Sequence, residues 1–342
     1  MRMHRRWGLP ATLLVACAAA AAGPASAADR EHEPSSFRLR DPRITESSGL
    51  AASRAHPGVY WTHNDSDDGP YVYAVDGRTG RTLATVTLRG VEPRDVEAVS
   101  VGPGGDVFVG DIGDNLGGAW SEVWVYRFPE PERLRDTTVT PTRSTLTYAD
   151  GPRDAESLMV SPTTGRLFVA SKSGSDGGLY AAPEELSASA PNTLRRIADI
   201  DIEATDGAFS PDGTRLVLRS YFGATMYRWT DSGRPEPLGP VPVSTFGQGE
   251  SVTFTPDGTT LMYGSEGRHS TVAPQELTGE ALPESVARER RSGDGGSPAE
   301  ADGQQPPAAP GEHRDLAVGA VVLAAATGVW MLLRRAARRG RV

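Results

Sequence analysis

The sequence predicts an all-β fold, and within that class a five-bladed β-propeller. Two short apolar runs joined by a Gly- and Pro-containing turn recur five times, with starts at positions 48, 97, 156, 206 and 250. Paired runs of this kind are typical of β-hairpins. Units spaced 44 to 59 residues apart, each with several strands, are typical of propeller blades. A β-sandwich with similar turns is the alternative architecture.

The repeat at 95–115 shows the pattern most clearly. Glu97 precedes an alternating run, a Gly-Pro-Gly-Gly-Asp turn follows, and the apolar run 107–109 ends in a polar segment that contains Asp111. Proline presets the first dihedral of such a turn and glycine accepts a positive φ. The same repeat spans 59 residues and carries further strand patterns at 123–126 and 137–139. Six blades therefore remain an alternative to five.

The last repeat is short, because few strand residues follow Glu266 before the composition changes. We expect residues 37–40, near the start of the domain, to supply the missing outer strand. Such a strand would close the ring and cover an exposed sheet edge. The propeller is assigned to residues 36–282.

The two ends of the chain predict export and anchoring. Residues 1–27 combine three arginines, an apolar run and an Ala-Ser-Ala end, which indicates a signal peptide cleaved before Ala28. Cys17, the only cysteine, also fits a bacterial lipobox, so its lipidation is left open. Residues 315–333 predict a transmembrane helix, and the arginine-rich tail 334–342 places the C-terminus in the cytoplasm. The expected location is the cell membrane, with a single pass and an extracellular propeller.

Residues 283–314 are rich in Gly, Pro, Ala and charged residues, which predicts a disordered stalk. Without the three arginines of the signal peptide and the five of the tail, 27 basic residues accompany 44 acidic ones. This excess of acid argues against nucleic acid as a partner. The membrane is the one predicted partner, and a small-molecule or surface partner is left unidentified.

Acidic residues recur where the five repeats begin. Equivalent positions of a closed ring meet around one axis, so we expect these carboxylates to converge at one mouth of the channel. Grouped carboxylates repel one another unless a cation or a basic group joins them. Oxygen ligands without a His or Cys cluster favour Ca²⁺. The alternative is that these acids tie neighbouring blades together. The predicted metal ligands are Glu97, Glu156, Asp206 and Glu250.

A second set of polar residues follows the second strand of each repeat. Lys172 is the only lysine in a chain whose other basic side chains, apart from histidine, are arginines. Together with Arg219 it is the predicted pair of catalytic residues, able to hold a phosphate or carboxylate. The predicted ligand-binding residues are Asn64, Asp65, Asp111, Tyr221 and Glu266.

Five short motifs carry a resemblance to a known family: Glu-Ser-Ser-Gly-Leu at 46–50, His-Asn-Asp-Ser at 63–66, Asp-Val-Glu-Ala at 95–98, Gly-Asp-Ile-Gly-Asp-Asn at 110–115 and Gly-Gln-Gly-Glu at 247–250. Over about 44–277 the chain resembles uncharacterised secreted and membrane-anchored bacterial β-propeller proteins. More distantly it is similar to phytase-like and SdiA-regulated-like propellers. The resemblance implies a propeller fold, and the phytase-like group implies Ca²⁺ and phosphoester chemistry.

Two functions from different classes follow. The first is a membrane-tethered extracellular propeller that binds a ligand or an ion, or serves as an interaction module. The second is a Ca²⁺-dependent hydrolase, with phosphoesters as candidate substrates and metal-bound water as the nucleophile. The sequence contains no Gly-x-Ser-x-Gly motif, which excludes one common hydrolase site. Because propellers support both binding and catalysis, the fold does not decide between the two.

Overall fold

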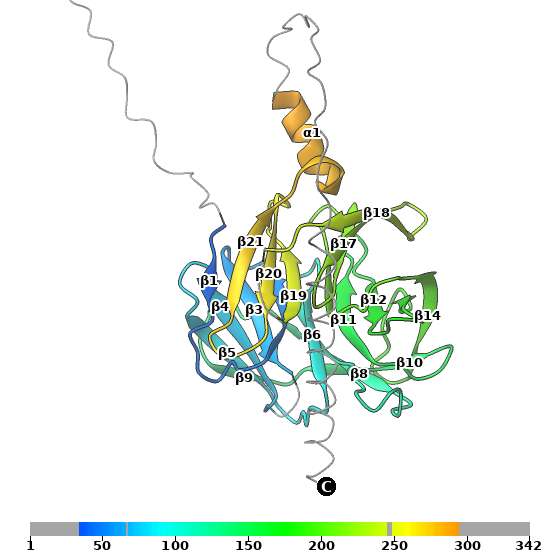
Figure 1. The fold of residues 1–342 in the computed structure, drawn as a ribbon. Coiled ribbons are helices and arrows are strands. Elements are labelled where there is room, and N and C mark those ends of the chain that lie inside the picture. The colour runs from blue at the N-terminus through cyan, green and yellow to red at the C-terminus, as the bar shows by residue number, and fades with distance from the viewer. Residues whose placement is uncertain (1–33, 66–67, 245–247, 294–342) are drawn as a thin grey trace, which may run out of the picture. The chain divides into compact units, whose positions relative to one another are not determined.

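The computed structural model describes residues 34–65, 68–244 and 248–293 (Figure 1). These residues form four hydrogen-bonded sheets, a short 3-10 helix and one α-helix. The first sheet contains β2 (Ser47–Ala52), β3 (Val59–Asn64), β4 (Tyr71–Asp76) and β5 (Thr82–Leu88), and β9 (Thr137–Val139) pairs in parallel with β5.

The largest sheet has eight strands and consists of two antiparallel groups of four. One group is β6 (Val96–Val101), β7 (Asp106–Asp111), β8 (Val123–Pro129) and β10 (Thr142–Tyr148). The other is β11 (Ala155–Val160), β12 (Leu167–Ser171), β13 (Gly178–Ala181) and β14 (Asn192–Asp199). The outer strands β10 and β14 pair in parallel and join the two groups.

The two remaining sheets have four strands each. One contains β15 (Asp206–Phe209), β16 (Arg215–Arg219), β17 (Ala224–Trp229) and β18 (Pro235–Val241). The other contains β19 (Gly249–Phe254), β20 (Thr260–Ser265), β21 (Thr271–Glu276) and β1 (Phe37–Arg38).

The first strand of each repeat lies at the centre of the molecule. Strand β2 contacts β6, β6 contacts β11, β11 contacts β15, β15 contacts β19, and β19 returns to β2. Apolar side chains pack between successive groups of strands; Trp61, for example, meets Phe128 edge to face at 6.4 Å between ring centroids. The predicted all-β class is confirmed, and the arrangement is propeller-like.

The N-terminal strand completes the last sheet as predicted. In β1, Phe37 pairs with Val272 of β21, and the ring of Phe37 stacks on Tyr60 at 5.7 Å. The backbone of Leu39 then donates to the carbonyl of Ser270 at 3.0 Å, and the Leu39 side chain is fully buried. The start of the domain is thereby fastened between the last sheet and the first.

The stalk predicted to begin at residue 283 requires a correction. Residues after η1 (Gly279–Ala281) instead form a helix, α1 (Glu284–Gly293). Val286 is buried against the third and fourth sheets, and the backbone and hydroxyl of Ser285 each donate to Asp212 at 3.0 Å. These contacts order a segment whose composition is typical of disorder. The compact domain therefore reaches Gly293 rather than residue 282.

Several predictions fall on residues that the structure does not describe. They are the signal peptide 1–27 with Cys17, the rest of the stalk, the transmembrane segment 315–333 and the basic tail 334–342. Within the described ranges, no helix has the length and apolar character that a membrane crossing requires.

Replacing Leu39 by Ala should lower the free energy of unfolding by about 2–5 kcal/mol, because a fully buried leucine would leave a cavity in the closure between sheets. Leu83→Ala is the matched control, since Leu83 is 41% exposed, and it should cost less than about 1 kcal/mol. Urea denaturation followed by tryptophan fluorescence measures both values. Equal losses for the two variants would show that the N-terminal segment does not hold the ring closed.

Candidate functional site

Three glutamates occupy equivalent places at the beginnings of three central strands. Glu97 of β6, Glu156 of β11 and Glu250 of β19 each lie at a break in the strand register, where one residue is inserted. Such a β-bulge bends the strand and re-aims a side chain. All three side chains are buried at the end of the ring where the central strands begin, and we call this end the acidic mouth.

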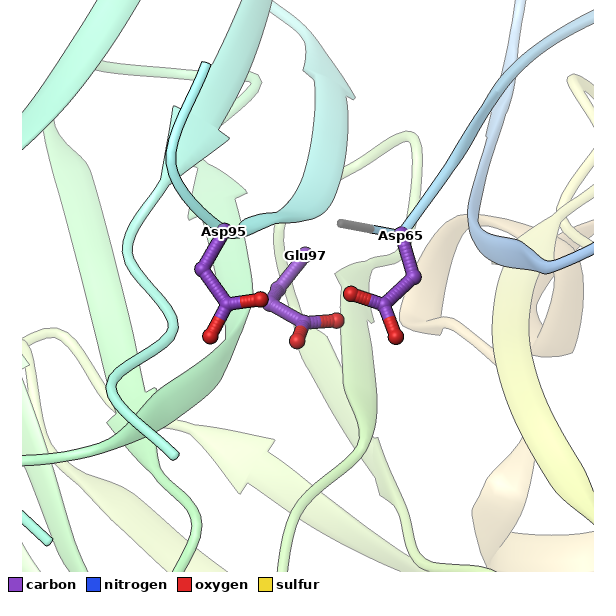
Figure 2. A group of neighbouring side chains, drawn as sticks. All are labelled: Asp65, Asp95 and Glu97. Atoms are coloured by element: carbon purple, nitrogen blue, oxygen red, sulfur yellow. The ribbon is translucent and has the colours of Figure 1, made fainter. Parts of the chain in front are cut away.

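Three carboxylates of the acidic mouth lie close enough to share one metal ion. Asp65 follows β3, Asp95 precedes β6, and Glu97 lies in the β6 bulge; one oxygen from each falls within 4.8 Å of the others (Figure 2). Ser48 donates to Glu97 Oε2 at 3.0 Å, and Asn115 donates to Asp95 Oδ2 at 2.9 Å. Of the four predicted metal ligands, Glu97 belongs to this trio. Asp65 was predicted as a ligand-binding residue.

Lys172 and Glu156 form a buried ion pair in the same region. The ammonium group also lies 5.0 Å from the centre of the Tyr221 ring. The second oxygen of Glu156 is buried and has no hydrogen-bond partner among the described residues. Glu250 accepts a hydrogen bond from Gln248 at 2.6 Å. The structure thus brings Lys172, Glu156 and Tyr221 together as the sequence predicted.

Burial is the main cause of the raised pKa values of the three glutamates at the acidic mouth. It raises the pKa of Glu97 well above its ordinary value, and the nearby charges of Asp65, Glu156 and Asp95 raise it further. Burial also raises the pKa of Glu156 to about 8, although Lys172 opposes the shift. The pKa of Glu250 rises by burial and by the charges of Glu156 and Glu266. A bound cation would remove the cost of ionising these groups.

Asp206 has a different role from the three glutamates. Strand β15 pairs with β16 without a bulge, so Asp206 sits one register position away from the glutamates. Its oxygens accept from the backbone of Gly207 and of Val252, each at 2.8 Å. Asp206 thereby joins β15 to β19, which is the blade-tying role that the sequence left as an alternative.

Arg219 is likewise engaged in the packing of the ring. Its side chain is fully buried, its Nη1 donates to the carbonyl of Ser251 at 3.2 Å, and its guanidinium lies 4.7 Å from the centre of the Tyr263 ring. Burial lowers its pKa to about 10. Arg219 therefore links its own strand to β19 through Ser251. Its predicted role in catalysis stays a prediction.

Three further predicted ligand-binding residues lie around the trio and Glu250. Asn64 accepts from the backbone of Thr45 at 2.9 Å and donates to the carbonyl of Arg43 at 2.8 Å, which fixes the chain beside Asp65. Asp111 accepts from the backbone of Asp95 at 2.9 Å. Glu266 is half-buried near Glu250, whose pKa it raises. These residues position the mouth and its charge.

Asp95 is the member of the trio that the sequence analysis did not select. Its spacing of two residues from Glu97 was visible, since alternate residues of a strand share one face. The bulge at Glu97, and the approach of Asp65 from another sheet, were not visible in the repeat pattern.

No family model and no curated protein matches the chain. Among solved structures, it is similar to a "putative 6-phosphogluconolactonase" from Bacteroides uniformis, with 16% identity, a TM-score of 0.40, and coverage of 72% of this chain and 70% of that one. A chain of a mitotic checkpoint complex shows 14% identity, a TM-score of 0.38 and coverage of 67% and 61%. The protein U3-55K shows 14% identity, a TM-score of 0.37 and coverage of 67% and 68%. Similarities this distant give no information about activity.

The raised pKa values predict how stability depends on pH when no divalent cation is present. The folded chain holds the proton of Glu156 up to a pKa of about 8, whereas an unfolded glutamate releases it near 4.5. The stabilisation is therefore complete below about pH 4.5 and is lost as the pH rises towards 8. The melting temperature measured in EDTA should accordingly decrease as the pH rises from 5 to 8.

Glu250→Gln should make this decline shallower, because it removes a second glutamate with a raised pKa. Glu132→Gln, at an exposed position, should reproduce the decline of the natural chain. A melting temperature that rises across this range would contradict the assignment of the buried carboxyls.

Proposed function

We propose that this chain is a membrane-tethered, extracellular, five-bladed propeller that binds a divalent cation at its acidic mouth. The observation that carries the proposal is the convergence of Asp65, Asp95 and Glu97 within 4.8 Å. These carboxylates come from two neighbouring sheets, so a shared ion would bridge them as well as fill the mouth.

The donor set favours Ca²⁺. The trio offers carboxylate oxygens alone, and the nearest histidine in sequence, His63, is buried with Nδ1 against the carbonyl of Asn64 at 2.9 Å. Calcium prefers six to eight oxygen ligands and accepts flexible geometry, with water or carbonyl groups completing the set. The ion would be held by the trio, and it would supply the charge that lets these buried carboxylates ionise.

The closed ring of central strands supports five blades. Each of β2, β6, β11, β15 and β19 contacts at least two others of the set and begins one group of four antiparallel strands. The signal sequence, the apolar run 315–333 and the arginines after it support the proposed tether and topology.

Calcium should stabilise the folded chain, because a ligand that binds the native state adds stability with its concentration. At about 100 times the dissociation constant the gain is roughly 2.7 kcal/mol. Glu97→Gln and Asp95→Asn should abolish most of this gain, because each removes one oxygen anion from the trio. Calorimetric melts with Ca²⁺ or with EDTA measure the difference.

Asp206→Asn is the matched control for these melts. It should lower stability in both conditions, since Asp206 ties two strands, while it preserves the response to Ca²⁺. If calcium stabilises the natural chain no more than the Glu97→Gln variant, the trio is not the cation site.

Lys172 is the group that bears on the hydrolase alternative. Its ammonium is buried, and its charge lowers the pKa of Glu97, so a fixed positive charge acts on the trio. A phosphoester bound to an ion there would meet this charge.

If the mouth hydrolyses phosphoesters, Lys172→Arg should reduce Ca²⁺-dependent turnover of p-nitrophenyl phosphate at least about tenfold, because a planar guanidinium cannot replace a compact ammonium. The calcium-dependent rise in melting temperature should persist. Absence of turnover by the natural chain across several phosphoesters and divalent metals would exclude this alternative and leave the binding function.

A further inference from the structure

A cleft lined with arginines lies at the other end of the ring. It runs between the third sheet and α1, the orange helix above β21 and β17 in Figure 1. Strand β16 begins with Arg215 in this cleft and ends with Arg219 near the acidic mouth, so the two features occupy opposite ends of one strand. Five arginines and two glutamates line the cleft: Arg215, Arg228, Arg288, Arg290, Arg291, Glu280 and Glu284.

Two of these arginines are directly opposed on neighbouring strands. Arg215 of β16 pairs with Arg228 of β17, and like charges placed in this way destabilise a sheet. Arg215 is buried and donates to the carbonyl of Glu280 at 2.9 Å, with the carboxylate of Glu284 3.8 Å away. Arg228 lies 3.5 Å from Glu236, whose side chain is 59% exposed. Exposed and distant ion pairs of this kind contribute little.

Helix α1 adds a second row of positive charge. Residues 284, 287, 288 and 291 line the cleft, and this spacing places them on one helix face. Arg290 reaches Glu276 at 3.6 Å. Among the described residues, no carboxylate lies within 4.0 Å of Arg288 or Arg291 in an ion pair, and both are exposed. The cleft therefore concentrates positive charge on a chain with 44 acidic and 35 basic residues.

We propose that this arginine cleft binds the phosphate groups of anionic lipids at the membrane surface. A guanidinium group binds phosphate through two parallel hydrogen bonds to its oxygens. Each basic residue close to an anionic bilayer adds about 1 kcal/mol to the binding free energy. The inference rests on the tether of the proposed function, whose membrane segment begins at residue 315, about 22 residues after α1 ends. This binding site is separate from the proposed cation site and does not depend on it.

The test uses the full chain in dodecyl maltoside micelles that contain either phosphatidylglycerol or phosphatidylcholine, followed by hydrogen–deuterium exchange of α1. Phosphatidylglycerol should slow exchange in α1, and about 0.5 M NaCl should reverse the effect by screening charge. The doubly substituted variant Arg288→Gln with Arg291→Gln should bind the anionic lipid about 30-fold more weakly. Replacing the same two residues by Lys should retain most of the binding, because it keeps the charge.

The matched control is Arg89→Gln with Arg195→Gln, which removes two exposed arginines outside the cleft and should change the affinity less than about threefold. The proposal is overturned if phosphatidylcholine slows exchange equally, if phosphatidylglycerol has no effect on the natural chain, or if the two Gln pairs lose affinity alike. Equal protection by inorganic phosphate without added lipid would overturn it too, because the ligand would then be free phosphate.

Discussion

The repulsion between buried carboxylates is the constraint on which the mouth of this ring depends. Glu97, Glu156 and Glu250 are each at most 5% exposed, and each has its pKa raised by burial. Lys172 contacts one of them, Glu156, and opposes the rise of its pKa. The trio around Glu97 then gathers further negative charge from Asp65 and Asp95. Protons or a cation must balance that charge, so the occupancy of the mouth and the stability of the ring are physically coupled.

Much of the fold was visible in the sequence because propeller blades repeat a simple local pattern. The five strand starts, the all-β class and the closing role of residues 37–40 follow from alternation, turn residues and a short last repeat. The site was less predictable, because a β-bulge adds one residue without a sequence signature. Asp206 was aligned with the three glutamates for this reason, although its strand lacks the bulge and its carboxylate binds the backbone of Val252.

The end of the domain shows the limit of composition as a guide. Residues 284–293 are mostly charged or small, and the pattern predicted disorder. Two apolar side chains four residues apart, Leu282 and Val286, are nevertheless buried, and Asp212 receives two hydrogen bonds from Ser285. A few tertiary contacts of this kind can order a helix that its own sequence would not stabilise. Such contacts depend on a distant hairpin, so a local reading of the segment could not have found them.

Charge is also distributed along the axis of the ring. The carboxylates lie where the central strands begin, whereas the arginine cleft lies where β16 begins and β17 ends. An anionic membrane attracts the second surface and repels the first, but screening limits both effects to about 8 Å at physiological salt. Only a protein surface within about that distance of the lipid then interacts electrostatically with it. Lipid bound at the arginine cleft, as proposed, would therefore leave the acidic mouth at the opposite end of β16 exposed to solution.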